Sequence, residues 1–238
     1  MRILGIESSS LVASVAVVTD DCLTAEYTVN LKKTHSQTLL PMIDEMIRLL
    51  EIELDSIDAI AVSAGPGSFT GLRIGSATAK GLGLALDKPL IHVPTVEAMA
   101  YNLYGAAGII CPIMDARRNQ VYTGMYRFET EFEVVLESSA MDINQLTEML
   151  NQKKERVIFL GDGVPVYREM IIAGLKVPGL FAPAHQNRQR AGAVAALGTW
   201  YYERGMTESA EEHAPEYLRK PQAEREREAA GLPIGDGE

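Results

Sequence analysis

The stretch SAGPGSFTGLRIGSATAKGLGLAL at residues 63–86 carries glycines of the kind that let a strand-to-helix turn bind phosphate. A P-loop has a lysine and then a serine or threonine directly after its last glycine, but leucine and arginine follow Gly71. The dinucleotide-binding pattern G-x-G-x-x-G also fails, because Thr70 occupies the position of the third glycine. The stretch therefore predicts a helix start that suits an anion, without the signature of a nucleotide site.

A single carboxylate and a pair of arginines are further candidates for chemistry. Glu7 follows an apolar run and precedes three serines, so it could position a water molecule or a metal ion at a strand end. A solvated strand-end residue is the alternative, which its spacing favours. In MDARRNQVY, the residues Asp115, Arg117 and Arg118 lie between two strand-like runs. Adjacent arginines in a hairpin can bind an anion, and a charged turn with a local ion pair is the equal alternative.

The histidines and the serines show no catalytic pattern. No H-x-x-x-H or H-E-x-x-H pair occurs, so a zinc site would require distant histidines to converge in space. The histidines lie in four separate regions of the chain, at His35, His92, His185 and His213. For His35, at the start of a helical pattern, we expect capping or a surface contact. Ser68 lacks the G-x-S-x-G spacing of a hydrolase nucleophile.

The elements that must hold these residues occur in the same order twice. Three strand-like runs, a helical pattern and one more buried strand occupy about residues 2–64 and again about 109–161. The first three strands predict an antiparallel meander. Ser36 and Asp142 are the predicted N-caps of the helices within the two units. A further helix is predicted from Gly71 to the end of the glycine-rich stretch.

This repeat predicts two similar α/β lobes, each a mixed sheet flanked by helices. The seam falls near residue 105, so we expect an N-terminal lobe at 1–105 and a C-terminal lobe at 106–220. The charged segment at 221–238 is expected to be a mobile tail.

The composition indicates a globular protein without its own affinity for polyanions. The chain has 238 residues, of which 47% are hydrophobic and 23% charged, enough for a sizeable core. Its formal net charge of −10 repels nucleic acid, so any such contact would need a local basic patch or a partner.

The cysteines and the apolar runs indicate a cytoplasmic protein. Cys22 and Cys111 are far apart and form no C-x-x-C motif, so we expect buried, reduced thiols. Glu7 and three serines interrupt the apolar core that a signal peptide would need. No apolar run reaches the length of a membrane span.

Small residues recur along one side of the helix predicted after Gly71. Gly71, Gly75, Ala79 and Gly83 follow one another at intervals of four residues, a row that lets another backbone approach closely. Each glycine within a helix costs about 0.5–1 kcal/mol relative to alanine, so close packing must compensate. The neighbour is either the chain's own sheet or helix, or a partner that also meets the apolar stripe of the helix at 36–50.

The chain resembles a known family in six segments that occur in order over about residues 1–226. They read ILGIESS, HSQTLLPMID, VSAGPGSFTGLRIGSATAKGLGLAL, PLIHVPTVEAMA, MDARRNQVYTGMY and APEYLRKPQAERE. Together they are similar to the TsaB family, the non-catalytic dimerisation subunit of the bacterial machinery that makes threonylcarbamoyladenosine on tRNA. The segment at 62–86 is the most specific of the six.

The resemblance implies a duplicated two-lobe fold of the actin, Hsp70 and sugar-kinase type. It also implies a scaffold that is required for threonylcarbamoyl transfer to the adenosine next to the anticodon of tRNAs reading A-starting codons. The metal-binding H-x-x-x-H of the catalytic paralogue falls on Thr95 and Met99, so no catalytic, metal or cofactor residue is implied here. Glu7 departs from the aspartate that is usual in the family.

The resemblance further implies the partners of the chain. It would pair with the catalytic TsaD-type paralogue through two helices, a small TsaE-type ATPase would join at that dimer, and tRNA would be met only through the complex. A homodimer is implied as possible for the isolated chain. The implied interface residues are His35, Leu39, Ile43, Gly71, Gly75, Ala79 and Gly83, with Arg73 and Lys80 as polar contacts.

Three alternatives to the scaffold remain open. A free-standing ATPase or phosphotransferase of the same fold would use Glu7 and the cleft between the lobes. A metal-dependent protease would need ligands that the sequence does not place together. A homodimeric protein that binds another partner is the third.

Overall fold

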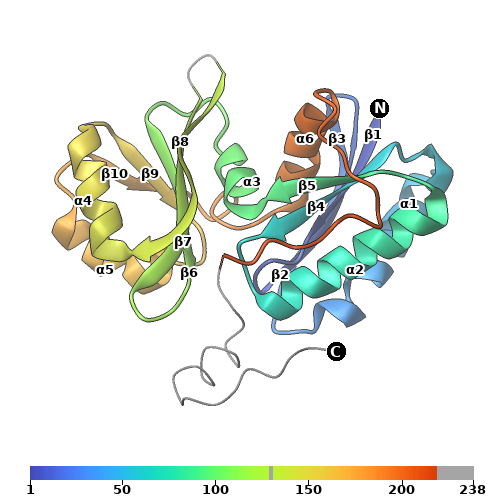
Figure 1. The fold of residues 1–238 in the computed structure, drawn as a ribbon, viewed down its shortest axis with the longest axis horizontal. Coiled ribbons are helices and arrows are strands. Elements are labelled where there is room, and N and C mark those ends of the chain that lie inside the picture. The colour runs from blue at the N-terminus through green and yellow to red at the C-terminus, as the bar shows by residue number, and fades with distance from the viewer. Residues whose placement is uncertain (129–130, 219–238) are drawn as a thin grey trace.

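The computed structural model describes residues 1–128 and 131–218, so the tail predicted at 221–238 lies outside the described residues. Two lobes lie side by side, each built on a five-stranded sheet (Figure 1). The first lobe follows the predicted order of strands and helices. Its elements are β1 (Arg2–Glu7), β2 (Val12–Thr19), β3 (Cys22–Asn30), α1 (Leu39–Leu50), β4 (Ala59–Gly65), α2 (Phe69–Leu86) and β5 (Leu90–Pro94), with short 3-10 turns at His35–Gln37 and Leu54–Ser56.

The second lobe repeats the order of strands and α-helices of the first. Its elements are β6 (Ile109–Asp115), β7 (Gln120–Phe128), β8 (Phe132–Asp142), α4 (Ile143–Lys153), β9 (Val157–Leu160), α5 (Val164–Gly174) and β10 (Gly179–Phe181). The strand orders are β3-β2-β1-β4-β5 and β8-β7-β6-β9-β10, with an antiparallel meander followed by two parallel strands in each. The predicted repeat of two mixed sheets is confirmed.

Along each strand, successive side chains point to opposite faces of the sheet, and both faces are buried. In β1, Leu4 and Ile6 face an outer core that α1 and α2 cover, whereas Ile3 faces an inner core. In the second lobe α4 and α5 cover the outer face, and β6 contributes Ile113 to that core. Both faces of each sheet are therefore apolar, which explains the long hydrophobic runs in the sequence.

The inner faces are covered by two helices that have exchanged lobes. The helix α6 (Ala191–Tyr202) follows the second sheet in sequence but packs on the first, with Val194 and Leu197 in its core. The helix α3 (Thr95–Tyr101) follows the first sheet and packs on the second. Both helices lie between the two sheets (Figure 1). The predicted division near residue 105 thus separates the two sheets but not their cores.

Two local predictions differ from the structure. Ser36 lies in the 3-10 turn, and Thr38 is the N-cap of α1. The Thr38 hydroxyl caps no amide of α1, because it donates to the carbonyls of Thr34 and His35 in the preceding turn. Cys22 is exposed at the start of the edge strand β3, whereas Cys111 is buried as expected. Asp142 is the predicted N-cap of α4, where its carboxylate accepts a hydrogen bond from the Asn144 amide at 2.8 Å.

Candidate functional site

The glycine-rich turn before α2 is fastened to the turn that joins β1 and β2. The Ser68 amide donates to the Ser9 carbonyl at 2.6 Å, and the Ser68 hydroxyl caps α2 by accepting from the Gly71 amide. A Cβ at Gly67 would overlap Ser9. The Ser68 amide is therefore already used inside the chain, and the glycines allow two turns to touch rather than open a cradle for phosphate.

The row of small residues on α2 packs against the chain itself. A Cβ at Gly71 would overlap the Ser8 carbonyl, and one at Gly75 would overlap the Ser8 hydroxyl, which donates to the Gly71 carbonyl at 2.9 Å. Gly83 lies against Leu90 and Ala210. The turn after β1, strand β5 and the C-terminal segment of the same chain thus provide the close neighbours that the row required.

Several residues predicted at a partner interface are consequently internal. Leu39, Ile43 and Ala79 belong to the outer core of the first lobe and have no free surface to offer a partner. His35 is buried rather than superficial, and its Nε2 lies 2.8 Å from the Ser10 carbonyl. The correction follows from helix geometry, because residues four apart share whichever face the sheet covers.

The two polar residues assigned to the interface behave differently from each other. Arg73 is exposed on α2 with its guanidinium over the Phe69 ring, 4.6 Å from the ring centre. Lys80 donates from Nζ to the carbonyls of Glu211 and His213 at 3.1 and 2.9 Å. Arg73 therefore remains available to a partner, whereas Lys80 holds the C-terminal part of the chain against α2.

The exposed side of α2, roughly opposite the buried row, carries a second row of small residues. Ala77, Gly81 and Ala85 are exposed at intervals of four residues, and no atom lies within 4 Å of a Cβ built at Gly81. Leu84, on the same side, is 57% exposed. The helix α1 adds further exposed apolar surface at Leu40 and Leu49.

A buried polar cluster joins the two lobes near the end of β1. Glu7 accepts hydrogen bonds from the amide and hydroxyl of Ser9 through Oε1, while its Oε2 has no partner among the described residues. Burial raises the pKa of Glu7 to about 7, opposed by the Ser9 hydrogen bonds and assisted by the charge of Asp162, which follows β9. Glu7 is thus buried, contrary to the solvated alternative that its spacing favoured.

The second-lobe side of this cluster is also short of hydrogen-bond donors. Burial raises the pKa of Asp162, which accepts a long hydrogen bond of 3.4 Å from Gln189 Nε2. The buried Oε1 of Gln189 has no partner in the described part of the chain. Oxygen atoms of this kind suit a water molecule or a hard cation such as Mg²⁺, and a carboxyl that titrates near neutral pH suits a general base.

The arginine hairpin between β6 and β7 is a compact turn with unusual backbone. Arg117, Arg118 and Asn119 have φ angles of 62°, 55° and 59°, the left-handed region that residues other than glycine rarely enter. Asp115 supports the turn by accepting from the Arg117 amide and from the Tyr167 hydroxyl, both at 2.8 Å. The turn places Arg118 in solvent.

Comparison with known proteins relates this arrangement to one family. A family model described as TsaD, tRNA N6-adenosine threonylcarbamoyltransferase, matches residues 24–227. The tRNA threonylcarbamoyladenosine biosynthesis protein TsaB of Bacillus subtilis is 36% identical over 228 residues, which cover 94% of this chain and 96% of the relative. The chain belongs to the TsaB family. Membership links it to tRNA threonylcarbamoyladenosine biosynthesis.

Solved structures agree with this TsaB assignment and with the fold. YeaZ from Pseudomonas aeruginosa has a TM-score of 0.79 and 25% identity, covering 91% of this chain and 99% of that one. Component A of the (R)-2-hydroxyglutaryl-CoA dehydratase of Acidaminococcus fermentans has a TM-score of 0.51 at 11% identity, covering 86% and 99%. This second likeness concerns the fold alone, the duplicated two-lobe α/β architecture.

The helices supply two further observations. Thr95 and Met99, where the resemblance placed the metal-binding histidines of a catalytic paralogue, are both buried in α3. Among the described residues, none of the helices is long and apolar enough to cross a membrane.

Sequence reasoning missed one convergence of histidines in this TsaB family member. His92 on β5 and His213 near the C-terminus lie with their ring centres 6.0 Å apart, although 120 residues separate them. No local spacing connects them, so only the folded chain reveals the pair.

Proposed function

We propose that the chain is a non-catalytic subunit of a tRNA threonylcarbamoyltransferase complex and pairs with the catalytic TsaD-type paralogue through α1 and α2. The observation that carries the proposal is the exposed row of Ala77, Gly81 and Ala85 beside Leu84. Exposed small and apolar residues at helical spacing allow a second helix to pack closely. This row replaces the buried row as the contact surface, with Arg73 as a polar contact at its edge.

The proposed absence of catalysis rests on the residues in α3. Threonine and methionine at positions 95 and 99 do not supply the imidazole ligands that the paralogue's metal requires. Both side chains are buried in the packed core around α3. In this proposal a small TsaE-type ATPase joins the pair, tRNA is met through the complex, and the isolated chain forms a homodimer through the same helices.

The interface is tested with a bulky residue on the exposed row. Gly81→Trp is expected to abolish co-purification of the catalytic paralogue from native lysate, read by mass spectrometry, because the indole would separate the helices. The monomer is expected to fold, since the site is open. Gln145→Trp, at an exposed position on α4 of the other lobe, is the matched control and is expected to retain the paralogue.

Retention of the paralogue by Gly81→Trp would exclude this face as the interface. Loss by both variants would point to a general defect instead. Gly75→Trp is unsuitable for this test, because Ser8 occupies the space of its side chain and the chain itself would be disrupted.

A second candidate function is an ATPase or phosphotransferase of the same fold. It is favoured by one observation, the buried Glu7 whose pKa of about 7 lies where a general base operates. Calorimetric titration of the isolated chain with Mg²⁺ and ATP tests it. Tight binding, together with turnover that Glu7→Gln removes, would support this candidate over the scaffold.

A further inference from the structure

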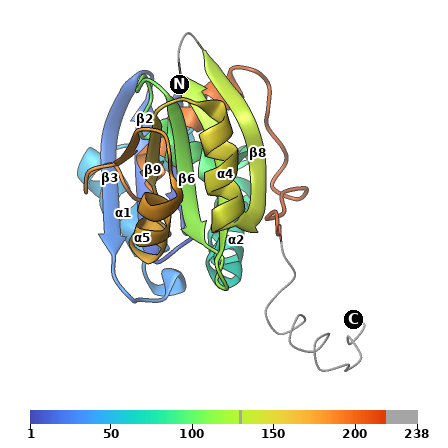
Figure 2. The same ribbon diagram turned by 90° about the vertical axis from the view of Figure 1, so that its left-hand side faces the viewer.

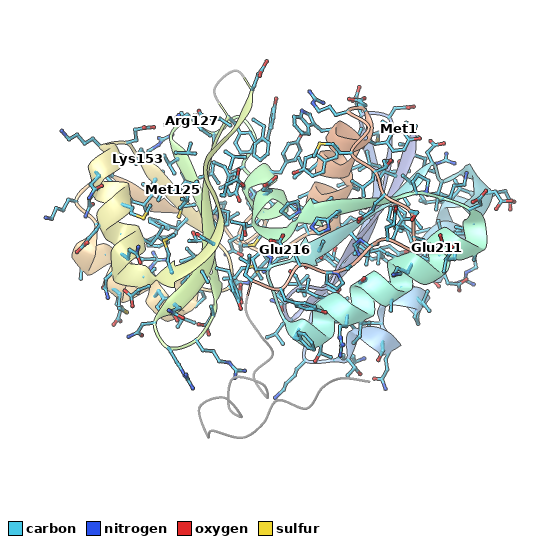
Figure 3. All side chains as sticks on the ribbon, in the orientation of Figure 1. Met1, Met125, Arg127, Lys153, Glu211 and Glu216 are labelled. Carbon is cyan, nitrogen blue, oxygen red and sulfur yellow. The ribbon has the colours of Figure 1, made fainter. Side chains whose placement is uncertain are left out.

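The C-terminal strap, defined here as residues 206–218, is bound to the first lobe without a helix or strand of its own. Glu208 exchanges two backbone hydrogen bonds with Leu90 of β5, and the Glu216 amide donates to the Ala64 carbonyl at 2.7 Å. Figure 1 shows the strap, in orange to red, running past β5 toward α2 and back to the middle of the molecule. Figure 2 shows it along one side of the molecule, and Figure 3 places Glu211 beside α2 and Glu216 nearer the second lobe.

Three side chains with metal-binding atoms meet where the strap crosses β5. His213 is buried, and its Nδ1 lies 2.6 Å from Glu208 Oε1. His92 reaches the same carboxylate oxygen with its own Nδ1, 3.9 Å away. One ligand atom from each of the three residues lies within 4.8 Å of the others.

The surroundings of His92 match those of a metal-bound histidine. The buried Nε2 of His213 has no partner in the described residues, whichever group its Nδ1 contacts. The second ring nitrogen of His92, Nε2, lies 3.9 Å from the Glu216 carboxylate. A carboxylate behind the outer nitrogen of a histidine is the arrangement that orients histidine ligands in metal sites.

We propose that His92, Glu208 and His213 bind a divalent transition metal ion of the zinc type, and that this ion clamps the strap onto β5. Two imidazoles and one carboxylate are ligands that Zn²⁺ prefers, at about 2.0–2.2 Å in a tetrahedron. An adjoining surface pocket, lined by Pro94, Glu97, Tyr201, Met206 and Thr207, leaves room for water as a fourth ligand. Small rotations of the side chains would bring the three atoms to the ion.

The ion would act on structure rather than on a reaction. Two of its three ligands belong to the strap, which is also attached by backbone hydrogen bonds, by the Lys80 ammonium and by Ala210 in the outer core. The strap also carries Tyr217, whose ring lies 4.5 Å from Phe69 at the start of α2. Binding of the ion would therefore fix an aromatic contact at one end of the proposed interface helix.

The test measures binding of ZnCl₂ to the full chain after removal of metal by a chelator. Calorimetry is expected to give one Zn²⁺ per chain, and CoCl₂ is expected to give the visible absorption of a tetrahedral site. His92→Ala and Glu208→Gln are each expected to weaken Zn²⁺ at least about tenfold. His185→Ala removes an exposed histidine outside the cluster and is the matched control, which should bind as the parent chain does.

The clamp is tested separately by limited proteolysis of the same proteins. Zn²⁺ is expected to slow cleavage within 206–218 in the parent chain and in His185→Ala, but not in His92→Ala or Glu208→Gln. Absence of stoichiometric Zn²⁺ binding by the parent chain would overturn the proposal, as would an equal loss of affinity in His185→Ala. Binding without protection would retain the site and overturn the clamp.

Discussion

At the scale of single residues, Glu7 shows what burial does to a charge. Its carboxyl lies at the end of β1 with one oxygen satisfied by Ser9 and the other without a described partner. Desolvation favours the protonated form, and the pKa rises from 4.5 to about 7. Between pH 4.5 and pH 7, Glu7 is therefore mostly protonated in the folded chain and mostly ionised in the unfolded chain.

Stability is expected to fall between pH 4.5 and pH 8 through this residue. A raised pKa stabilises the folded state fully below the unfolded value, and that stabilisation is lost as the pH rises through 7. The loss is on the order of 3 kcal/mol. Glu7→Gln should remove it, so urea unfolding at pH 5 and pH 8 should give a flatter dependence for the variant than for the parent.

Glu148→Gln, an exposed position on α4, is the control for this measurement. Parallel pH profiles for the parent and Glu7→Gln would show that the carboxyl is solvated. Asp162, whose pKa is also raised by burial, contributes a pH dependence in the same direction in both proteins.

The two cysteines are expected to differ in reactivity. Burial raises the pKa of Cys111 to about 12, so its thiolate is scarce at neutral pH, whereas Cys22 is exposed. Iodoacetamide at pH 8 should modify one cysteine in the folded chain and both in urea, as counted by mass spectrometry. Cys22→Ser should then give no modification in the folded state, and modification of Cys111 there would contradict the burial.

At the scale of elements, α2 presents small residues on two roughly opposite sides, and only one side is buried. A Cβ at Gly71 or Gly75 would overlap Ser8, whereas no atom lies within 4 Å of a Cβ at Gly81. Both rows have four-residue spacing in the sequence, so periodicity indicated close packing without showing which row the chain itself uses. The hydrophobic pattern of α2 does not show which row is buried, because alanine, glycine and leucine occupy both sides of the helix.

Two alanine substitutions in α2 are expected to have opposite effects on stability. Gly81→Ala should stabilise the chain by about 0.5–1 kcal/mol, because alanine favours helix and its Cβ has open space. Gly71→Ala should destabilise it by more than about 1 kcal/mol, because its Cβ would overlap the backbone carbonyl of Ser8. Urea unfolding measures both, and effects of the same sign would contradict this packing.

Most of the fold could be predicted from the sequence, but little of the candidate sites could. Hydrophobic periodicity is local, so it sufficed for the strand and helix order and for the repeat. The burial of Glu7 depends on the second lobe beside it, and the meeting of His92 with His213 depends on the strap returning to β5. Both are contacts between distant segments, which no local pattern encodes.

At the scale of the whole molecule, the lobes share helices and aromatic side chains. The helices α3 and α6 each cover the sheet of the other lobe, and the Tyr201 hydroxyl donates to the Glu97 carboxylate between them. Phe132 of β8 packs edge-on against Trp200 of α6 and against Tyr101 of α3. These contacts link the lobes into one cooperative unit.

A fragment of residues 1–105 is therefore expected not to fold on its own. Without α6 the inner face of its sheet, with Ile3 and Ile91, is open to water. The fragment should bind the dye ANS and show no cooperative thermal transition by near-UV circular dichroism, whereas the full chain should show one. A sharp transition in the fragment would show that the exchanged helix is dispensable.

The exchange of helices also sets an order of events during synthesis. A ribosome releases the first sheet early, but the helix that completes its core is the last one of the described chain to emerge. Domains at the N-terminus usually fold while the rest is being made. Here the nascent first lobe must wait, with one apolar face uncovered, until residues 191–202 are free. In the cell, the unfinished chain is therefore the form of this protein most prone to aggregation.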